Sequence, residues 1–84
     1  MGAVERETIH FVQAFVAGRG DALAAEPPIG CKSAAEACRK AERLGATRLG
    51  VVAFSVSADT ALGDYDEKPT ILFKTGRLPP PFDE

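Results

Sequence analysis

SAAEACRKAERLG, residues 33–45, has the pattern of one short amphipathic helix. Ser33 followed three residues later by Glu36 is a capping box, a signature of a helix N-terminus. Gly45 stands where such a helix would end. The small apolar residues recur at helical spacing and predict one buried face, formed by Ala34, Ala37, Cys38, Ala41 and Leu44.

Stretches of alternating apolar residues lie on both sides of this helix and predict β-strands. Four strands are expected, at residues 8–17, 22–26, 50–57 and 70–75. The second is rich in alanine, a poor strand former, and ends at Pro27-Pro28. The order ββαββ predicts an α+β fold with two layers: a four-stranded, mostly antiparallel sheet with the helix packed on one face.

The 84 residues suffice for one domain with a single modest core. We expect that domain to span residues 8–76, with residues 1–7 as a flexible N-terminus. Residues 77–84, RLPPPFDE, are rich in proline, which cannot donate to a β-ladder. They are expected to be a mobile tail.

The helix face is built from small side chains, so the bulk of the core is expected to come from the sheet. The phenylalanines of the strands are therefore predicted to face the helix. The residues predicted to form the core with the helix face are Ile9, Phe11, Phe15, Leu23, Val52, Phe54, Val56, Ile71 and Phe73.

One helix cannot cover both faces of a sheet, so the opposite face is expected to be open. The residues predicted to form a possible interaction face there are His10, Val12, Val16, Val51 and Leu72. An exposed apolar patch of this kind often marks an interface. Our first hypothesis is a non-enzymatic module that binds an unknown protein partner, or forms a homodimer, through this face. A half-polar surface without a partner is the competing interpretation.

Basic residues on and after the helix could contact phosphate groups, and these are Arg39, Lys40, Arg43 and Arg48. Weak nucleic-acid binding through them is our second hypothesis. Two observations count against it. The net charge of the chain is -2, whereas nucleic-acid binders usually carry a basic excess. Glu36 and Glu42 interleave with the basic residues, which is typical of a solvated helix face.

The sequence shows no catalytic pattern and no metal or cofactor motif, so neither an enzyme nor a cofactor is expected. His10 is the single histidine, and no nucleophile elbow or phosphate-binding loop accompanies it. Cys31 and Cys38 are too few for a zinc site. The acidic residues after position 58 lack the spacing of a calcium loop.

The chain has no apolar run near the roughly 20 residues that cross a bilayer. Its first residues, MGAVERE, also lack the basic start and apolar stretch of a signal peptide. We therefore expect a cytoplasmic protein that does not bind membranes.

Four stretches resemble a group of small bacterial proteins without an assigned activity. They are GVVAFS from Gly50, GDYDE from Gly63, PTILFKTG from Pro69, and Leu78-Pro79. The resemblance covers most of the chain and implies a bacterial origin and a compact domain. It implies no function.

Overall fold

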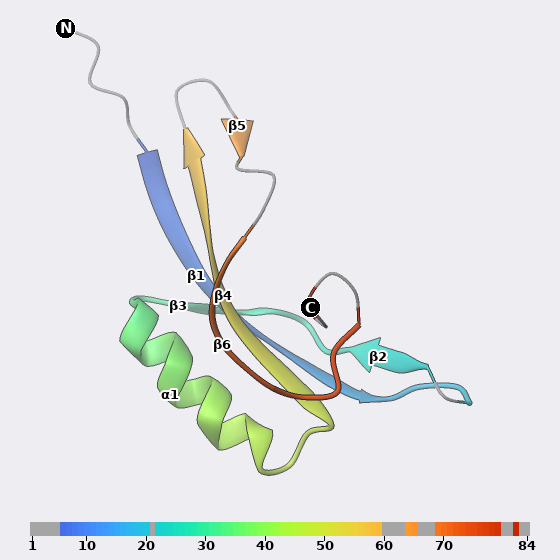
Figure 1. The fold of residues 1–84 in the computed structure, drawn as a ribbon. Helices are drawn as coiled ribbons and strands as arrows, with labels where there is room; N and C mark the ends of the chain where they lie inside the picture. The colour runs from blue at the N-terminus through green and yellow to red at the C-terminus, as the bar shows by residue number, and fades with distance from the viewer. Residues whose placement is uncertain (1–5, 21, 60–63, 66–68, 80–81, 83–84) are drawn as a thin grey trace, which may run out of the picture.

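A computed structural model describes residues 6–20, 22–59, 64–65, 69–79 and 82. One helix packs on one face of an open antiparallel sheet, so the fold is α+β, as predicted (Figure 1). The elements in chain order are β1 Arg6–Ala17, β2 Leu23–Ala25, β3 Ile29–Cys31, α1 Ala34–Gly45, β4 Gly50–Asp59, β5 Asp64–Tyr65 and β6 Thr70–Gly76.

The two long strands, β1 and β4, form the centre of the sheet. They pair from Arg6↔Asp59 to Phe15↔Gly50. Both β2 and β3 pair with the other edge of β1, while β5 and β6 pair with the other edge of β4. The sheet is therefore four strands wide, with two strand segments at each outer position.

The prediction of four strands in the order ββαββ was wrong in detail, because the sheet has six strands. The main omission is β3. Pro27 and Pro28 lack backbone N–H groups and interrupt the pairing after Glu26, whose N–H still donates to the Ala14 carbonyl (2.9 Å). The chain then pairs with β1 again at Ile29. The first strand also begins two residues earlier than predicted, at Arg6.

The start of α1 is the one that the capping box predicts. The Ser33 hydroxyl oxygen accepts a hydrogen bond from the Glu36 N–H (3.1 Å). The Glu36 carboxylate in turn accepts from the Lys32 N–H (2.7 Å), one residue before the cap. At the other end Gly45 is still helical, and the cap is Ala46 in a right-handed conformation. The helix therefore ends without the left-handed glycine that the sequence suggested.

The face of the sheet that α1 covers is built from small residues. The buried cluster under the helix consists of Val12, Ala14, Ala37, Ala41, Val51 and Ala53. Small side chains on both elements let the helix axis lie close to the sheet. The prediction that the strand phenylalanines face the helix was therefore correct for Phe73, which packs against this cluster, and wrong for the others. Strand alternation places Phe11, Phe15 and Phe54 on the opposite face.

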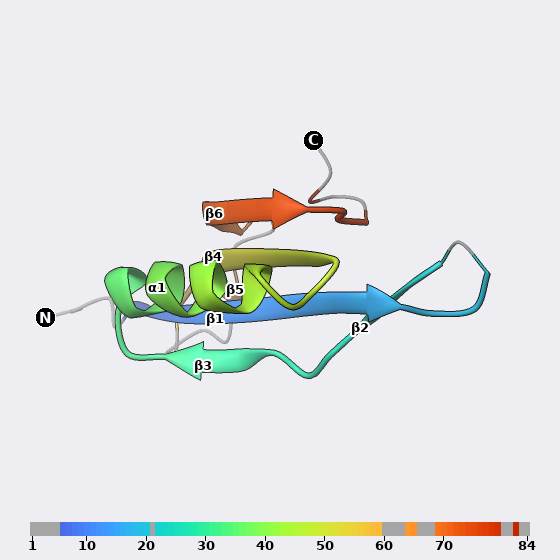
Figure 2. The ribbon, with the colours of Figure 1, turned by 90° about the horizontal axis from the view of Figure 1, so that it is seen from below.

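A crossover connection explains on which side the helix lies. Both β3 and β4 are antiparallel to β1, so they are parallel to each other with β1 between them. Between them α1 crosses in front of β1, and the crossover is right-handed (Figure 2). Nearly all such connections have this hand. Without β3 the connection could not be recognised from the sequence.

A register shift in β6 changes the face of one phenylalanine. Phe54 pairs with Ile71, but Ala53 pairs with Phe73, so an irregularity lies between the two pairs. Phe73 and Leu72 both pack against the cluster under α1. Of the two residues of this strand that were predicted to lie in the core under the helix, Phe73 therefore lies there and Ile71 does not.

Candidate functional site

The face of the sheet opposite α1 is the largest candidate surface, and we call it the phenylalanine face. It comprises Ile9, Phe11, Gln13, Phe15, Val52, Phe54, Val56 and Ile71, with the pairs Ile9↔Val56, Phe11↔Phe54, Gln13↔Val52 and Phe54↔Ile71. None of these eight side chains is charged. By strand alternation Glu7 and Lys74 lie at its borders.

One end of this face is open, and we call Ile9, Phe11, Val56 and Ile71 the uncovered end. Ile9 is 38% exposed and Ile71 is 40% exposed. Phe11 lies against Phe54 with the ring centroids 5.5 Å apart. On its other side Phe11 pairs with Gly30, and a Cβ atom built there would meet nothing within 4 Å. Apolar side chains at this end therefore border open space.

The other end is covered by the segment that follows β6. The Phe82 ring lies 5.6 Å from the Phe54 ring and 6.5 Å from the Phe15 ring, between centroids. Beneath it Phe15 is only 4% exposed. The Lys74 ammonium donates to the Phe82 carbonyl oxygen (3.4 Å). Figure 1 shows this segment and α1 on opposite sides of the sheet.

The described residues after β6 lie against the sheet. Arg77 donates its N–H to the Leu49 carbonyl (2.9 Å), which extends the pairing beyond β6. Leu78, Pro79 and Phe82 are all partly buried. Phe82 packs on the sheet because its ring covers aromatic rings that would otherwise face water.

Two glycines allow the segment after β6 to pass close to β4. At Gly50 a Cβ atom would lie 1.8 Å from the Arg77 carbonyl oxygen, so any side chain there would collide with the returning backbone. Gly76 has a φ of 76°, a left-handed conformation that favours glycine. The turn after β6 and the close approach to β4 therefore both depend on glycine.

The interaction face predicted from the sequence is not available to a partner. Val12 and Val51 are fully buried, at 0% exposure, and lie under α1. Leu72 packs against the same cluster. His10 and Val16 are partly buried on that face. The prediction of an open sheet face holds, but the residues assigned to it were those of the covered side.

Polar side chains meet near the start of α1, where the helix face of the sheet becomes more polar. His10 Nδ1 and Ser55 Oγ are 2.7 Å apart and share a hydrogen bond. Cys31 pairs with His10 from the other side. Burial raises the pKa of the Cys31 thiol above its usual value; nearby Lys40 opposes this shift and Glu36 adds to it.

Ser55, His10 and Cys31 thus form a row across β4, β1 and β3. A raised pKa lowers the thiolate fraction of Cys31, which is the opposite of nucleophile activation. Ser55 is only 8% exposed, and its hydroxyl is engaged by His10. In the part of the chain that the structure describes, no three His, Cys, Asp or Glu side chains are grouped to hold a metal ion.

The four basic residues of the second hypothesis have different surroundings. Arg48 forms an ion pair with Glu26, with Nε and Oε1 2.6 Å apart. Arg39 and Arg43 are exposed on α1, and Lys40 is partly buried. A phosphate group could therefore meet three of the four predicted residues on the helix.

No family model matches this chain, and no curated protein or solved structure matches it either. No helix within the described ranges is long and apolar enough to cross a membrane.

Proposed function

We propose that this protein is a non-enzymatic interaction module that associates with a second copy of itself through the uncovered end of the phenylalanine face. The observation that carries the proposal is the pair of exposed isoleucines, Ile9 at 38% and Ile71 at 40%, beside the aromatic pair Phe11–Phe54. Removing such apolar area from water stabilises a complex by about 25 cal/mol per Å².

The charge distribution favours a second copy as the partner. A two-fold interface brings the same surface of both molecules together, so a charged group close to the two-fold axis would face its own like charge. The uncovered end has no charged member. It can therefore stack on its own copy without removing a charge from water, while Glu7 and Lys74 remain at the borders.

Weak nucleic-acid binding is the second candidate, and the structure supports it less well. Exposed aromatic rings on a sheet can stack with bases, but such sites also need a basic groove for the backbone. The cation at the border of the face, Lys74, donates to the Phe82 carbonyl. Arg39 and Arg43 lie on α1, on the opposite side of the sheet.

The test is sedimentation velocity of the wild-type chain and the Phe11→Glu variant over concentrations from about 10 μM to 1 mM, where weak interfaces are half-occupied. We expect the wild type to associate. The variant should weaken association by about tenfold or more, because each glutamate would occur twice in the interface. Ala35→Glu, on the exposed side of α1, adds the same charge and is the matched control.

A wild-type chain that stays monomeric over this range would overturn the proposal. So would equal association of the Phe11→Glu variant. Titration of the wild type with single-stranded DNA and RNA at low salt tests the second candidate, nucleic-acid binding. Binding that disappears in the Arg39→Glu and Arg43→Glu variants would favour the helix surface instead.

A further inference from the structure

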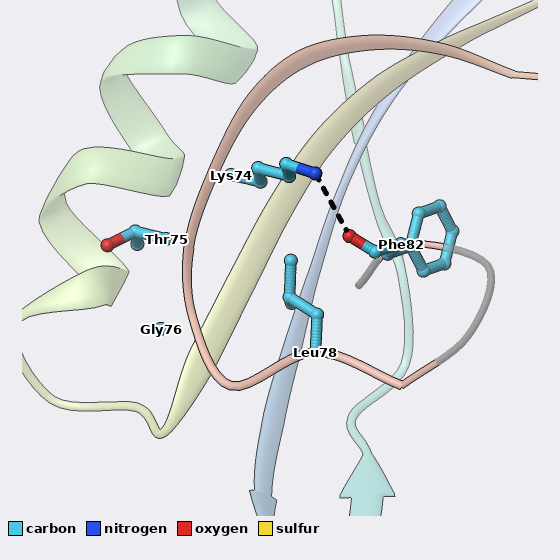
Figure 3. Close-up of a pocket in the computed structure, with 5 residues that line it drawn as sticks. All are labelled: Lys74, Thr75, Gly76, Leu78 and Phe82. Atoms are coloured by element: carbon cyan, nitrogen blue, oxygen red, sulfur yellow. Dashed lines mark hydrogen bonds between the residues drawn. The ribbon is translucent and has the colours of Figure 1, made fainter. Parts of the chain in front are cut away.

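Phe82 occupies the covered end of the phenylalanine face as a bound side chain would. Its ring is held between Phe15 and Phe54 at 6.5 and 5.6 Å, and its carbonyl oxygen accepts from Lys74 at 3.4 Å. Figure 3 shows Lys74, Leu78 and Phe82 on one side of β6, while Thr75 points toward α1. We call the surface formed by Phe15, Phe54 and Lys74 the aromatic site.

The attachment of Phe82 to the sheet depends little on the backbone that leads to it. The pairing of β4 and β6 ends at Gly50↔Gly76, and one further backbone hydrogen bond joins Arg77 to Leu49. The Phe82 N–H then donates to the Pro79 carbonyl (2.9 Å), within the segment itself. Among the described residues after β6, Phe82 contacts the aromatic site through its side chain and its carbonyl oxygen.

The segment is also packed loosely against β6. A cavity of about 290 Å³ lies between them, lined by Lys74, Thr75, Gly76, Leu78 and Phe82 (Figure 3). Few buried contacts and few backbone hydrogen bonds give a segment a low free energy of local opening.

We propose that the aromatic site binds an aromatic side chain carried by a proline-rich segment of a partner protein, and that Phe82 is the occupant supplied by the chain itself. The contacts of Phe82 define the chemistry of the partner: a ring to lie between Phe15 and Phe54, and a carbonyl oxygen to accept from Lys74. Residues 79–81 are three consecutive prolines. Prolines restrict the free segment and so reduce the entropy lost on binding.

The chain's own segment competes with a partner because it is tethered beside the site. A short tether supplies its ligand at a millimolar effective concentration. The apparent affinity for a partner falls by the fraction of molecules in which the site is free. If Phe82 occupies the site in nine molecules out of ten, a partner binds about tenfold more weakly than it would to an empty site.

The experiment uses the full-length Phe82→Ala variant and a synthetic peptide with the sequence of residues 77–84, RLPPPFDE. Binding is followed by NMR shifts of the chain, at concentrations below those at which it associates. We expect saturable shifts that include Phe15 and Phe54. The wild-type chain should bind the same peptide about tenfold more weakly.

Two matched controls test the role of the rings. The same peptide with alanine in place of its phenylalanine should not bind. A Phe54→Leu substitution added to the Phe82→Ala chain removes one ring but keeps an apolar side chain, and it should also abolish binding. Circular dichroism shows whether each variant is folded, and Phe82→Leu replaces Phe82→Ala if the latter is not.

Equal binding of the two peptides would overturn the proposal, and so would a folded Phe82 variant without shifts. Equal affinity of the wild type and the Phe82 variant would show that Phe82 does not compete for the site. This test is independent of the proposed self-association, because Phe11→Glu changes the uncovered end. A negative result in one assay does not contradict the proposal that the other assay tests.

Discussion

The two faces of the sheet come from the same two strands, yet they are buried in different ways. On the helix side Val12, Val51 and Ala53 are fully buried by another layer of the fold. On the other side the larger phenylalanines cover one another, in the pairs Phe11–Phe54 and Phe54–Phe82. Small residues need a close second layer to be buried, whereas large rings can bury part of their surface in each other.

Because of this difference, we expect substitutions on the helix side to lower the stability of the fold. Substitutions at the uncovered end of the phenylalanine face should be tolerated. Neighbouring residues of β1 lie on the two sides, so they provide direct comparisons.

Val12→Glu should unfold the protein, since it places a charge under α1 where Val12 is 0% exposed. The expected loss of stability is about 4 kcal/mol or more. Phe11→Glu, one residue away on the other face, should remain folded. Thermal unfolding followed by circular dichroism measures both. Equal melting temperatures would mean that the two faces do not differ as described.

Gly50→Ala should detach the segment after β6, because its Cβ atom would lie 1.8 Å from the Arg77 carbonyl oxygen. The expected cost is about 2–3 kcal/mol, with new exposure of Phe15. Gly30→Ala is the control, since a Cβ atom there meets nothing within 4 Å. Urea unfolding and binding of an apolar dye report on stability and exposure. A Gly50→Ala chain as stable as the control would contradict the close approach.

Ala41→Phe should overpack the contact between α1 and the sheet, where Ala41 is 0% exposed. The expected cost is about 1–3 kcal/mol. The matched substitution Ala35→Phe lies on the exposed side of the helix and should cost less. An unchanged midpoint of chemical unfolding for Ala41→Phe would place the helix farther from the sheet.

Ile71→Thr should have the smallest effect on the folded monomer, because Ile71 is 40% exposed at the uncovered end. The loss should stay near about 0.5 kcal/mol. Val51→Thr, which buries a hydroxyl group under α1, should cost about 1–3 kcal/mol. Comparison of the two unfolding midpoints measures the difference between the faces for similar changes in polarity.

Part of the candidate site could be predicted from the sequence. Alternation in residues 8–16 and 50–57 correctly grouped Ile9, Phe11 and Phe15 on one face and Val12 on the other. The role of Phe82 could not be predicted, because a ring contact across the sheet leaves no periodic signal in a short proline-rich segment.

The sequence by itself determined the helix, with its cap at Ser33, and the two sets of side chains on each central strand. These features depend on local geometry, namely the 3.6-residue period of a helix and the two-residue period of a strand. Only the tertiary structure decided which set lies under α1. That choice depends on the right-handed β3–α1–β4 crossover and on the close fit of small residues, and both join segments far apart in the chain.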